Sequence, residues 1–482
     1  MSVRKESDSL GDVSVPSEAY YGAFTQRALE NFQVSSYTTH SSMVRALGLL
    51  KLAAAQANME LGLLDKKRGE AIVKASEEVI EGKFNNEFSM DVFQAGAGTP
   101  LNMCANEVIA NRATEILGGK KGEYWVHPNN HVNMGQSSNN VIPSAIKIAA
   151  YALSENVTAQ MEALEEALEK KAKEFNKILK TGRTHLQDAV PVTLGQEFEA
   201  YAAFVRRDAN KVRIAANTLL ELGLGGTAIG TGITAHPKFG KAAVKNVVEV
   251  TGVKFFETNE HIYLTQSVMP FVDLSGAMRM SAIDLLKVSN DLVFMSSGPR
   301  AGISEIQLPE VEPGSSIMPG KVNPSIVEAL KMACVKVVGN DTAIEMAAKE
   351  GQMELNVMTP VIAHCLIESL EVFANAVKMF TEKCVKGITA DDQRARELLE
   401  QSTAMATALN PYLGYEVMSR IVKTCISENR SVKDVILENQ LMSKADLDKV
   451  LDIESLTKPG EVDAGLAEKV KKSKAYEKFT AK

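Results

Sequence analysis

The feature that most constrains this fold is a set of long segments in which apolar side chains recur at helical spacing. Over residues 157–179 they stand three, four or seven positions apart on a background of Glu and Lys, as in an amphipathic helix. The same period returns in 198–219, 274–295, 325–349 and 361–380. These segments exceed the roughly 11 to 12 residues of an average globular helix. We therefore expect five long helices packed as a bundle, with apolar stripes long enough to pack against further copies of the chain.

The composition agrees with a large helical core. Hydrophobic residues make up 45% of the 482 positions and charged residues 23%, which excludes a disordered chain. Aromatic residues are scarce at 6% and methionines number 20, a mixture that favours helix packing over a β-sandwich. Short amphipathic helices broken by Gly, Pro and Asn loops are expected on both sides of the long segments. We predict an all-α subunit of three domains: an N-terminal helical domain (1–140), a central five-helix bundle (141–395) and a small C-terminal helical domain (396–482).

Charge and cysteine usage exclude several classes of function. The formal net charge of −7 gives no general attraction for nucleic acid or an anionic membrane, so an anionic ligand needs a local positive pocket. The five cysteines are scattered and form no CxxC pair, so neither a disulfide framework nor a zinc site is predicted. No apolar leader and no run of 18 apolar residues is present, and we expect a cytoplasmic protein in a reducing compartment.

Two polar loops near the start of helical segments carry dense hydrogen-bonding groups. One holds Gly98, Thr99 and Asn102, and the other is Gln-Ser-Ser-Asn-Asn at 136–140. Any single Ser or Asn here has about even odds of being a helix cap. The run of four such residues exceeds the need of one cap, and hydroxyls, an amide and helix N–H groups together suit a carboxylate.

Two more loops are candidates for chemistry. His185 stands in Gly-Arg-Thr-His-Leu-Gln-Asp (182–188), where neighbouring polar groups make it a candidate proton handler or substrate donor. The segment 312–324 contains two Pro-Gly pairs together with a Ser-Ser, a Lys and an Asn, as expected of a mobile lid. A nucleophile elbow requires Gly where Met318 stands, and a Walker loop requires Ser or Thr where Val322 stands.

Two further patterns are interpreted as structural. The Gly-rich stretch 223–232 lacks G-x-G-x-x-G spacing and no strand is expected before it, so we predict a turn or tight packing there rather than a dinucleotide site. His127 and His131 are four residues apart, but Pro128 lies between them and no HExxH motif is present. We therefore predict no metal site.

The loop at 312–324 and several other segments resemble the fumarase/aspartase superfamily. The loop reads G-S-S-x-x-P-x-K-x-N at 314–323, and the likeness continues in NEVIANRA (106–113), HVNMGQSSN (131–139), GRTHLQDAVPVTLGQEFEAY (182–201), SSGPRAG (296–302) and ELNVMTPV (354–361). The resemblance implies a homotetramer with a core of about twenty long helices, five per subunit, and active sites where three chains meet. It also implies an anti-elimination that yields fumarate or a relative, without an organic cofactor.

The resemblance assigns roles to individual residues of this sequence. Ser315 matches the base that removes a proton from the carbon β to the leaving group; Lys321, loop amides and water exclusion would lower its pKa. The aci-carboxylate intermediate then needs donors, and Glu328 matches the carboxylate that partners His185 from a neighbouring chain. The implied donors and substrate contacts are Thr99, Ser137, Ser138, Asn139, Thr184, His185, Ser316, Lys321 and Asn323.

The details of the sequence favour one member of the superfamily and leave two alternatives. EAYYG (18–22), VIEGKF (79–84), GAGT (96–99) and THLQDAVP (184–191) resemble aspartate ammonia-lyases, which implies conversion of L-aspartate to fumarate and ammonia. Ser137-Ser138, the stretch 274–277 and His364 resemble fumarate hydratases instead. Pro100, Asn140 and residues 264–271 fit neither pattern and leave room for an amine-lyase acting on a bulkier cation such as a trimethylammonium betaine. The 127–130 segment resembles the second carboxylate-binding loop of fumarases and is left without a role.

Overall fold

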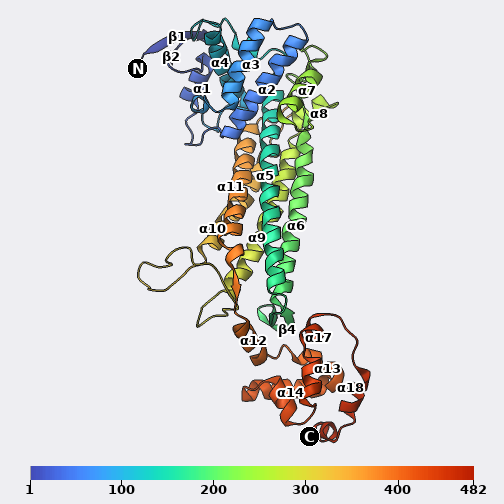
Figure 1. Cartoon of the computed structure of the whole chain (residues 1–482). Coiled ribbons are helices and arrows are strands. Elements are labelled where there is room, and N and C mark those ends of the chain that lie inside the picture. Colours follow the sequence, from blue (N-terminus) through green and yellow to red (C-terminus); the bar gives the residue numbers. More distant parts are fainter. Residues whose placement is uncertain (1, 482) are drawn as a thin grey trace. The chain divides into compact units, whose positions relative to one another are not determined.

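The computed structural model describes residues 2–481 and shows a mainly helical chain (Figure 1). The predicted fold class is confirmed. The chain divides into two compact units: the first comprises 1–160, 208–283 and 332–375, and the second 161–207, 284–331 and 376–482. The three-domain division stays a prediction.

Five long helices contribute residues to both units, and within each unit they lie alongside one another (Figure 1). They are α5 (Ser138–Glu174), α6 (Leu194–Asn217), α9 (Met269–Met295), α10 (Ser325–Ala348) and α11 (Thr359–Lys383). The prediction was wrong about α5, because the helix starts at Ser138 instead of 157 and ends before Phe175. Its first turns are buried on almost every side, so no amphipathic period marks them.

Helix α11 also has the length and the apolar composition of a membrane-spanning helix. The segment Thr359–Gly387, which contains α11, is long and apolar enough to cross a bilayer by length and composition alone. Of its most apolar window, 61% is buried inside the structure. Burial of this kind is typical of a helix in a protein core.

The first unit contains a β-hairpin that the sequence patterns did not predict and helices of unequal length. Its elements are β1 (Val3–Asp8), β2 (Gly11–Pro16), α1 (Ala23–Asn31), α2 (Ser41–Glu60), α3 (Lys66–Ile80), α4 (Thr99–Ile116) and α7 (Phe239–Thr251). Helix α2 packs against α3 and α7 and buries 14 of its 20 residues. The expectation of only short amphipathic helices here was therefore wrong, since α2 is long and buried all round.

Short pieces complete the first unit. A parallel pair joins β5 (Glu221–Leu222) to β6 (Phe256–Glu257), and α8 (His261–Gln266) follows. Contrary to our expectation, a strand does precede the Gly-rich stretch, although it has only two residues. A Cβ added to Gly230 would clash with the backbone nitrogen of Ile262, so this loop is a site of tight packing, as predicted.

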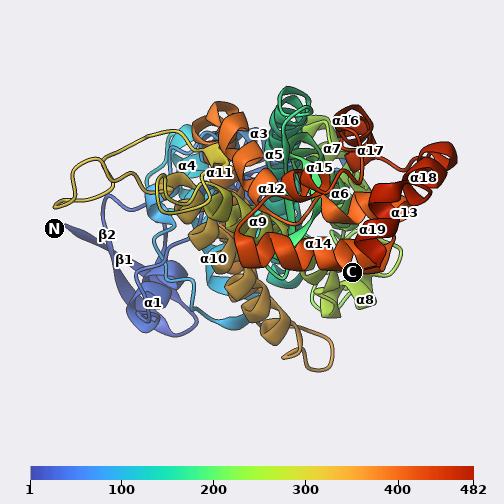
Figure 2. The ribbon, with the colours of Figure 1, turned by 90° about the horizontal axis from the view of Figure 1, so that it is seen from below.

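The second unit contains a hairpin between α5 and α6 and a cluster of short helices, seen from below in Figure 2. The hairpin consists of β3 (Leu179–Thr184) and β4 (Gln187–Thr193), and β7 (Ile306–Gln307) pairs with β8 (Thr389–Ala390). The short helices are α12 (Asp392–Gln401), α13 (Ala406–Leu413), α14 (Tyr415–Glu428), α15 (Val432–Glu438), α16 (Lys444–Val450), α17 (Ile453–Thr457), α18 (Ala464–Lys471) and α19 (Lys474–Thr480). Most begin with a Ser or Asp side chain that accepts a backbone N–H bond, and they enclose an apolar core around Leu409, Ile421 and Ile436.

Candidate functional site

The first polar loop presents Thr99 at the start of α4. Ala97 (φ 59°) and Gly98 (φ 69°) form a left-handed turn, and the Ala97 N–H donates to the Val357 carbonyl at 2.9 Å. Thr99 is half-buried at the first helical position. Pro100 occupies the next position, where a missing backbone N–H costs little, so this departure from the family pattern is accommodated by the helix geometry.

The second polar loop caps α5. The Ser137 hydroxyl accepts the Asn139 N–H at 3.3 Å, and the Asn140 side-chain oxygen accepts the Ser137 N–H at 3.1 Å. This reciprocal pair resembles a capping box, with Asn in the place of Glu and with the Ser137 hydroxyl accepting the second helical N–H and not the third. The cap interpretation therefore holds for Ser137 and Asn140, which explains two of the four polar residues.

The remaining two residues of that loop make other contacts. The Ser138 hydroxyl accepts a bond from the Asn102 amide nitrogen at 3.1 Å, and Asn139 donates to the Ala228 carbonyl of the Gly-rich loop at 2.7 Å. Asn102 lies on α4, one turn after Thr99, so the two polar loops adjoin in the first unit. A small anion-binding surface at the α5 N-terminus is the arrangement that these groups can form.

His185 and Leu186 form the two-residue turn of the β3–β4 hairpin. Both residues are left-handed, with φ of 57° and 58°, between the paired Thr184 and Gln187. Hairpin turns of this type normally use Asn-Gly or Gly, and a non-glycine residue there stores strain. Leu186 is exposed, so packing does not explain its conformation. Strain concentrated beside an exposed imidazole is typical of a functional turn.

A buried ionic cluster anchors this hairpin. Arg183 forms a bidentate pair with Glu305, with Nη–Oε distances of 3.0 and 2.8 Å, and Glu305 is fully buried. Lys180 Nζ lies 3.4 Å from the same carboxylate and 3.2 Å from Glu197. Burial raises the pKa of Glu197, partly offset by Lys180. These pairs hold Thr184 and His185 against the segment that leads into β7.

The Gly-Ser-Ser loop closes on itself. The Gly314 N–H donates to the Lys321 carbonyl at 2.8 Å, and the Asn323 side chain donates to the Gly314 carbonyl at 2.8 Å. A Cβ on Gly314 would lie 2.6 Å from the Lys321 oxygen, so only glycine fits. These two bonds bring Lys321 and Asn323, both predicted site residues, next to Gly314 and so close along the loop to Ser315.

The Ser315 hydroxyl oxygen receives two backbone donors. The Ile317 and Met318 N–H groups donate to it at 3.2 and 3.1 Å. Donors aimed at one oxygen stabilise its negatively charged form and make deprotonation easier. Ser315 is half-buried, whereas Ser316, Lys321 and Glu328 are exposed, with Glu328 in the first turn of α10.

The predicted site residues fall into two sets. Thr99 and Ser137–Asn139 belong to the first unit, and the members of the second unit are Thr184, His185, Ser315, Ser316, Lys321, Asn323 and Glu328. Each set is gathered by the loops described above. The assembly of both sets at one site, and the roles assigned to their residues, stay predictions.

The polar groups of residues 127–130 bond to one another and cap the short helical turn that they begin. The segment enters a π-helical turn (Pro128–Val132), and His127 Nδ1 accepts the Asn129 and Asn130 N–H groups at 3.1 and 3.3 Å. His131 Nδ1 accepts the His127 N–H at 2.8 Å, and burial lowers the pKa of both imidazoles. Among residues 2–481 no group of three His, Cys, Asp or Glu side chains is placed to hold a metal ion.

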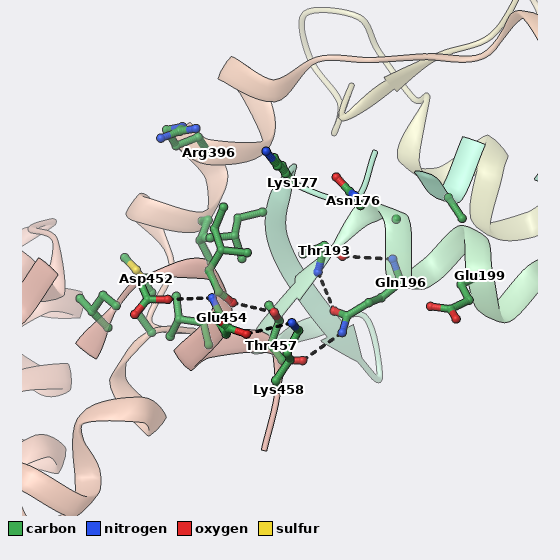
Figure 3. A pocket seen from close by; sticks show the side chains of 18 of the residues that line it. Asn176, Lys177, Thr193, Gln196, Glu199, Arg396, Asp452, Glu454, Thr457 and Lys458 are labelled. Atoms are coloured by element: carbon green, nitrogen blue, oxygen red, sulfur yellow. Dashed lines mark hydrogen bonds and ion pairs between the residues drawn. The ribbon is translucent and has the colours of Figure 1, made fainter. Parts of the chain in front are cut away.

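An open cavity of about 1100 Å³ lies in the second unit, between the end of α5, the β4–α6 junction, α12 and α17 (Figure 3). Gln196 bridges its wall by accepting from the Thr193 N–H and donating to the Thr457 carbonyl. Its charged side chains include paired groups, such as Lys458 with Glu454 at 3.0 Å. The described residues that line it include none of the polar-loop residues, so the cavity is separate from the candidate site.

Sequence patterns missed two elements that support the candidate site. One is the Arg183–Glu305 pair, which joins residues 122 positions apart. The other is Lys51 of α2, which is fully buried and contacts the Asn102 side chain. A lysine inside the apolar run Leu-Gly-Leu-Leu-Lys-Leu-Ala (47–53) was the available signal for the second.

Comparison with known proteins places these loops in a family. The model described as "Lyase" matches residues 11–339 and that of the "Fumarase C C-terminus" matches 405–458. Aspartate ammonia-lyase of Bacillus subtilis is 43% identical over 97% of this chain and 98% of its own. Class II fumarate hydratase of Halobacterium salinarum is 48% identical over 95% and 97%.

Solved structures agree with the sequence comparisons. A fumarate lyase:delta crystallin from Brucella melitensis, bound to cobalt, superposes with a TM-score of 0.92 at 42% identity, covering 95% of this chain and all of that one. Class II fumarase from Schistosoma mansoni gives 0.90 at 35% identity, covering 93% and 98%. The chain is therefore a lyase of the fumarase/aspartase superfamily.

Proposed function

We propose that this protein is an aspartate ammonia-lyase, which converts L-aspartate to fumarate and ammonia. The observation that carries the proposal is the Ser315 hydroxyl with two backbone N–H donors, in a loop closed by Lys321 and Asn323. The similarity to the Bacillus subtilis enzyme supports the choice of substrate.

The first step removes a proton from the carbon β to the amine. Ser315 Oγ acts as the base, and the N–H groups of Ile317 and Met318 stabilise its alkoxide. The electron pair of the broken C–H bond moves into the neighbouring carboxylate, which becomes an aci-carboxylate dianion. Lys321 and Asn323 stand on the same loop as positive and polar partners for that charge.

The second step breaks the C–N bond. The electron pair returns from the aci-carboxylate to form the carbon–carbon double bond, and the substrate's protonated amine, an ammonium group, leaves with the bonding electrons as neutral ammonia. Fumarate is released, and the proton on Ser315 returns to solvent. No oxidant or reductant is required, because the elimination is redox-neutral.

The proposed active form is a homotetramer in which each site combines loops from different chains. Thr99 and Ser137–Asn139 of one chain would meet the Thr184–His185 turn and the Gly-Ser-Ser loop of others, with Glu328 orienting His185. The support is the membership of the fumarase/aspartase superfamily, whose active sites form where three chains meet. Light scattering of the purified protein tests this assembly, and a monomer with full activity would refute it.

A second activity, hydration of fumarate to malate, is favoured by a specific observation. Ser137-Ser138 matches the fumarase pattern, and the class II fumarase of Halobacterium salinarum is 48% identical. Formation of fumarate from L-aspartate and from L-malate, followed by absorbance with the same preparation, separates the two activities. Faster turnover of malate would replace our first proposal with the second.

A further inference from the structure

Lys51 is a charged side chain placed where charge is costly. It is fully buried near the middle of α2, among apolar residues. Its Nζ donates to the side-chain oxygens of Asn102 at 2.8 Å, Asn133 at 3.1 Å and Gln136 at 3.0 Å. Burial lowers its pKa well below the usual range for lysine. Three neutral oxygens are thus the groups that offset the desolvation of the ammonium.

An ammonium has three donors and no acceptor, so every amide that faces it must present oxygen. The NH₂ groups of the three amides must then point away from Lys51. Asn133 uses its NH₂ on the Gln136 carbonyl at 3.2 Å, and Gln136 uses its own on the Val132 carbonyl at 2.9 Å. Lys51 therefore fixes the orientation of all three amides.

The third amide, that of Asn102, connects Lys51 to the candidate site. Asn102 Nδ2 donates to Ser138 Oγ at 3.1 Å, and Ser138 is the first residue of α5. Because Asn102 donates, Ser138 must accept in that bond, and its own O–H is left to donate elsewhere. The buried positive charge and the α5 N-terminus both favour an anion as the recipient.

We propose that Lys51 is a positioning residue for substrate: by orienting Asn102 it makes Ser138 a hydrogen-bond donor to a substrate carboxylate. This inference rests on the proposed function, because it requires that Ser138 binds the carboxylate of the substrate. Lys51 itself touches neither substrate nor reacting atoms. Its effect falls on binding of the dicarboxylate and not on the proton transfer at Ser315.

The test uses succinate, a dicarboxylate that lacks the amine and cannot react, titrated calorimetrically into the full-length protein. Lys51→Met and Ser138→Ala should each weaken succinate binding about 10- to 100-fold, the range for a hydrogen bond to a charged group. The double variant should bind no more weakly than Ser138→Ala alone, because both changes remove the same bond. In turnover assays Lys51→Met should raise KM more than it lowers kcat.

Two more variants control for folding. Lys147 is also a buried lysine of the first unit, but it donates to the Glu221 backbone carbonyl at 2.7 Å, so Lys147→Met should leave succinate binding within about twofold of wild type. Asn102→Asp gives Lys51 a buried carboxylate partner and retains the fold. Its side chain can only accept hydrogen bonds, so the Ser138 O–H would donate to it and no longer to the ligand. Asn102→Asp should therefore weaken succinate binding, and it should weaken binding less when Ser138 is already Ala.

The outcomes separate the inference from the proposed function. Weakened binding in Ser138→Ala but not in Lys51→Met or Asn102→Asp would overturn the role of Lys51 alone. Equal losses from Lys51→Met with and without Ser138 would show a general structural effect, and would also overturn it. Unchanged binding in Ser138→Ala would remove Ser138 from the site, and would overturn both statements.

Discussion

Replacement of Glu305 by Gln is the change whose effect the structure defines most closely. The carboxylate is fully buried, accepts two bonds from Arg183 and lies 3.4 Å from Lys180. Gln keeps the size and shape of the side chain but removes the charge. The buried Lys180 and the half-buried Arg183 are then left at the base of the β3–β4 hairpin, and only Lys180 retains another carboxylate, Glu197.

The cost follows from the burial of the pair. Breaking a buried ion pair by removing one partner costs about 3–5 kcal/mol, because an uncompensated charge remains inside the protein. Since Lys180 keeps Glu197, we expect the lower end of that range, about 3 kcal/mol. At 1.4 kcal/mol for each factor of ten, opening of the hairpin becomes about 100-fold more frequent.

Hydrogen exchange followed by mass spectrometry measures this opening locally, without requiring two-state unfolding of the whole chain. The peptide covering 179–193 should exchange about 100-fold faster in Glu305→Gln. Glu197→Gln is the matched control: its side chain is partly exposed, and it should accelerate exchange about tenfold or less. Equal protection in Glu305→Gln and wild type, or an equal loss in the control, would show that the Arg183–Glu305 pair does not anchor the hairpin.

Three further predictions concern the turn, the acid stability and the lid. Leu186→Asn should increase the free energy of unfolding by roughly 0.5–1 kcal/mol, because Asn accepts the left-handed backbone at this exposed position. Calorimetry should then show a higher melting temperature, and a lower one would contradict strain at this turn. The hydrogen bond from the Arg112 guanidinium holds the pKa of Glu78 in the folded protein below its ordinary value of 4.5. The ion pair therefore stabilises the fold above pH 4.5, and this stabilisation is lost as the pH falls through the lowered pKa. Glu78→Gln should flatten this acid loss in circular dichroism between about pH 6 and pH 3, and an unchanged profile would contradict it. Gly314→Ala forces a Cβ against the Lys321 carbonyl, so kcat should fall at least about 100-fold while the melting temperature stays constant; normal turnover would contradict the closed loop.

Local patterns were enough to predict the long helices and the polar loops. The five helices have one apolar and one solvated face along much of their length, and that contrast produces the 3.6-residue period. The pattern failed at the start of α5 and along α2, where burial on all sides removes the contrast. Residue types alone located the loops, because Ser-Ser, Lys and Asn beside Gly and Pro are rare in simple connections.

Contacts between distant residues could not be predicted in the same way. The β3–β4 hairpin has a bulge between Thr181 and Arg183, which breaks the alternation that marks a strand. The sequence patterns missed Lys51 in its apolar run, and its amide partners lie 51 to 85 positions away along the chain. Only the fold shows that they meet beneath Ser138.

The role of Ser315 as the base and of L-aspartate as the substrate is tested most directly by measuring fumarate and ammonia together, in the wild type and in Ser315→Ala. We expect equal amounts of the two products from the wild type. We expect no product from Ser315→Ala, whose circular dichroism and melting temperature should match the wild type. Fumarate from the folded Ser315→Ala variant at a substantial fraction of the wild-type rate would exclude Ser315 as the base. Absence of ammonia from the wild type would exclude aspartate as the substrate.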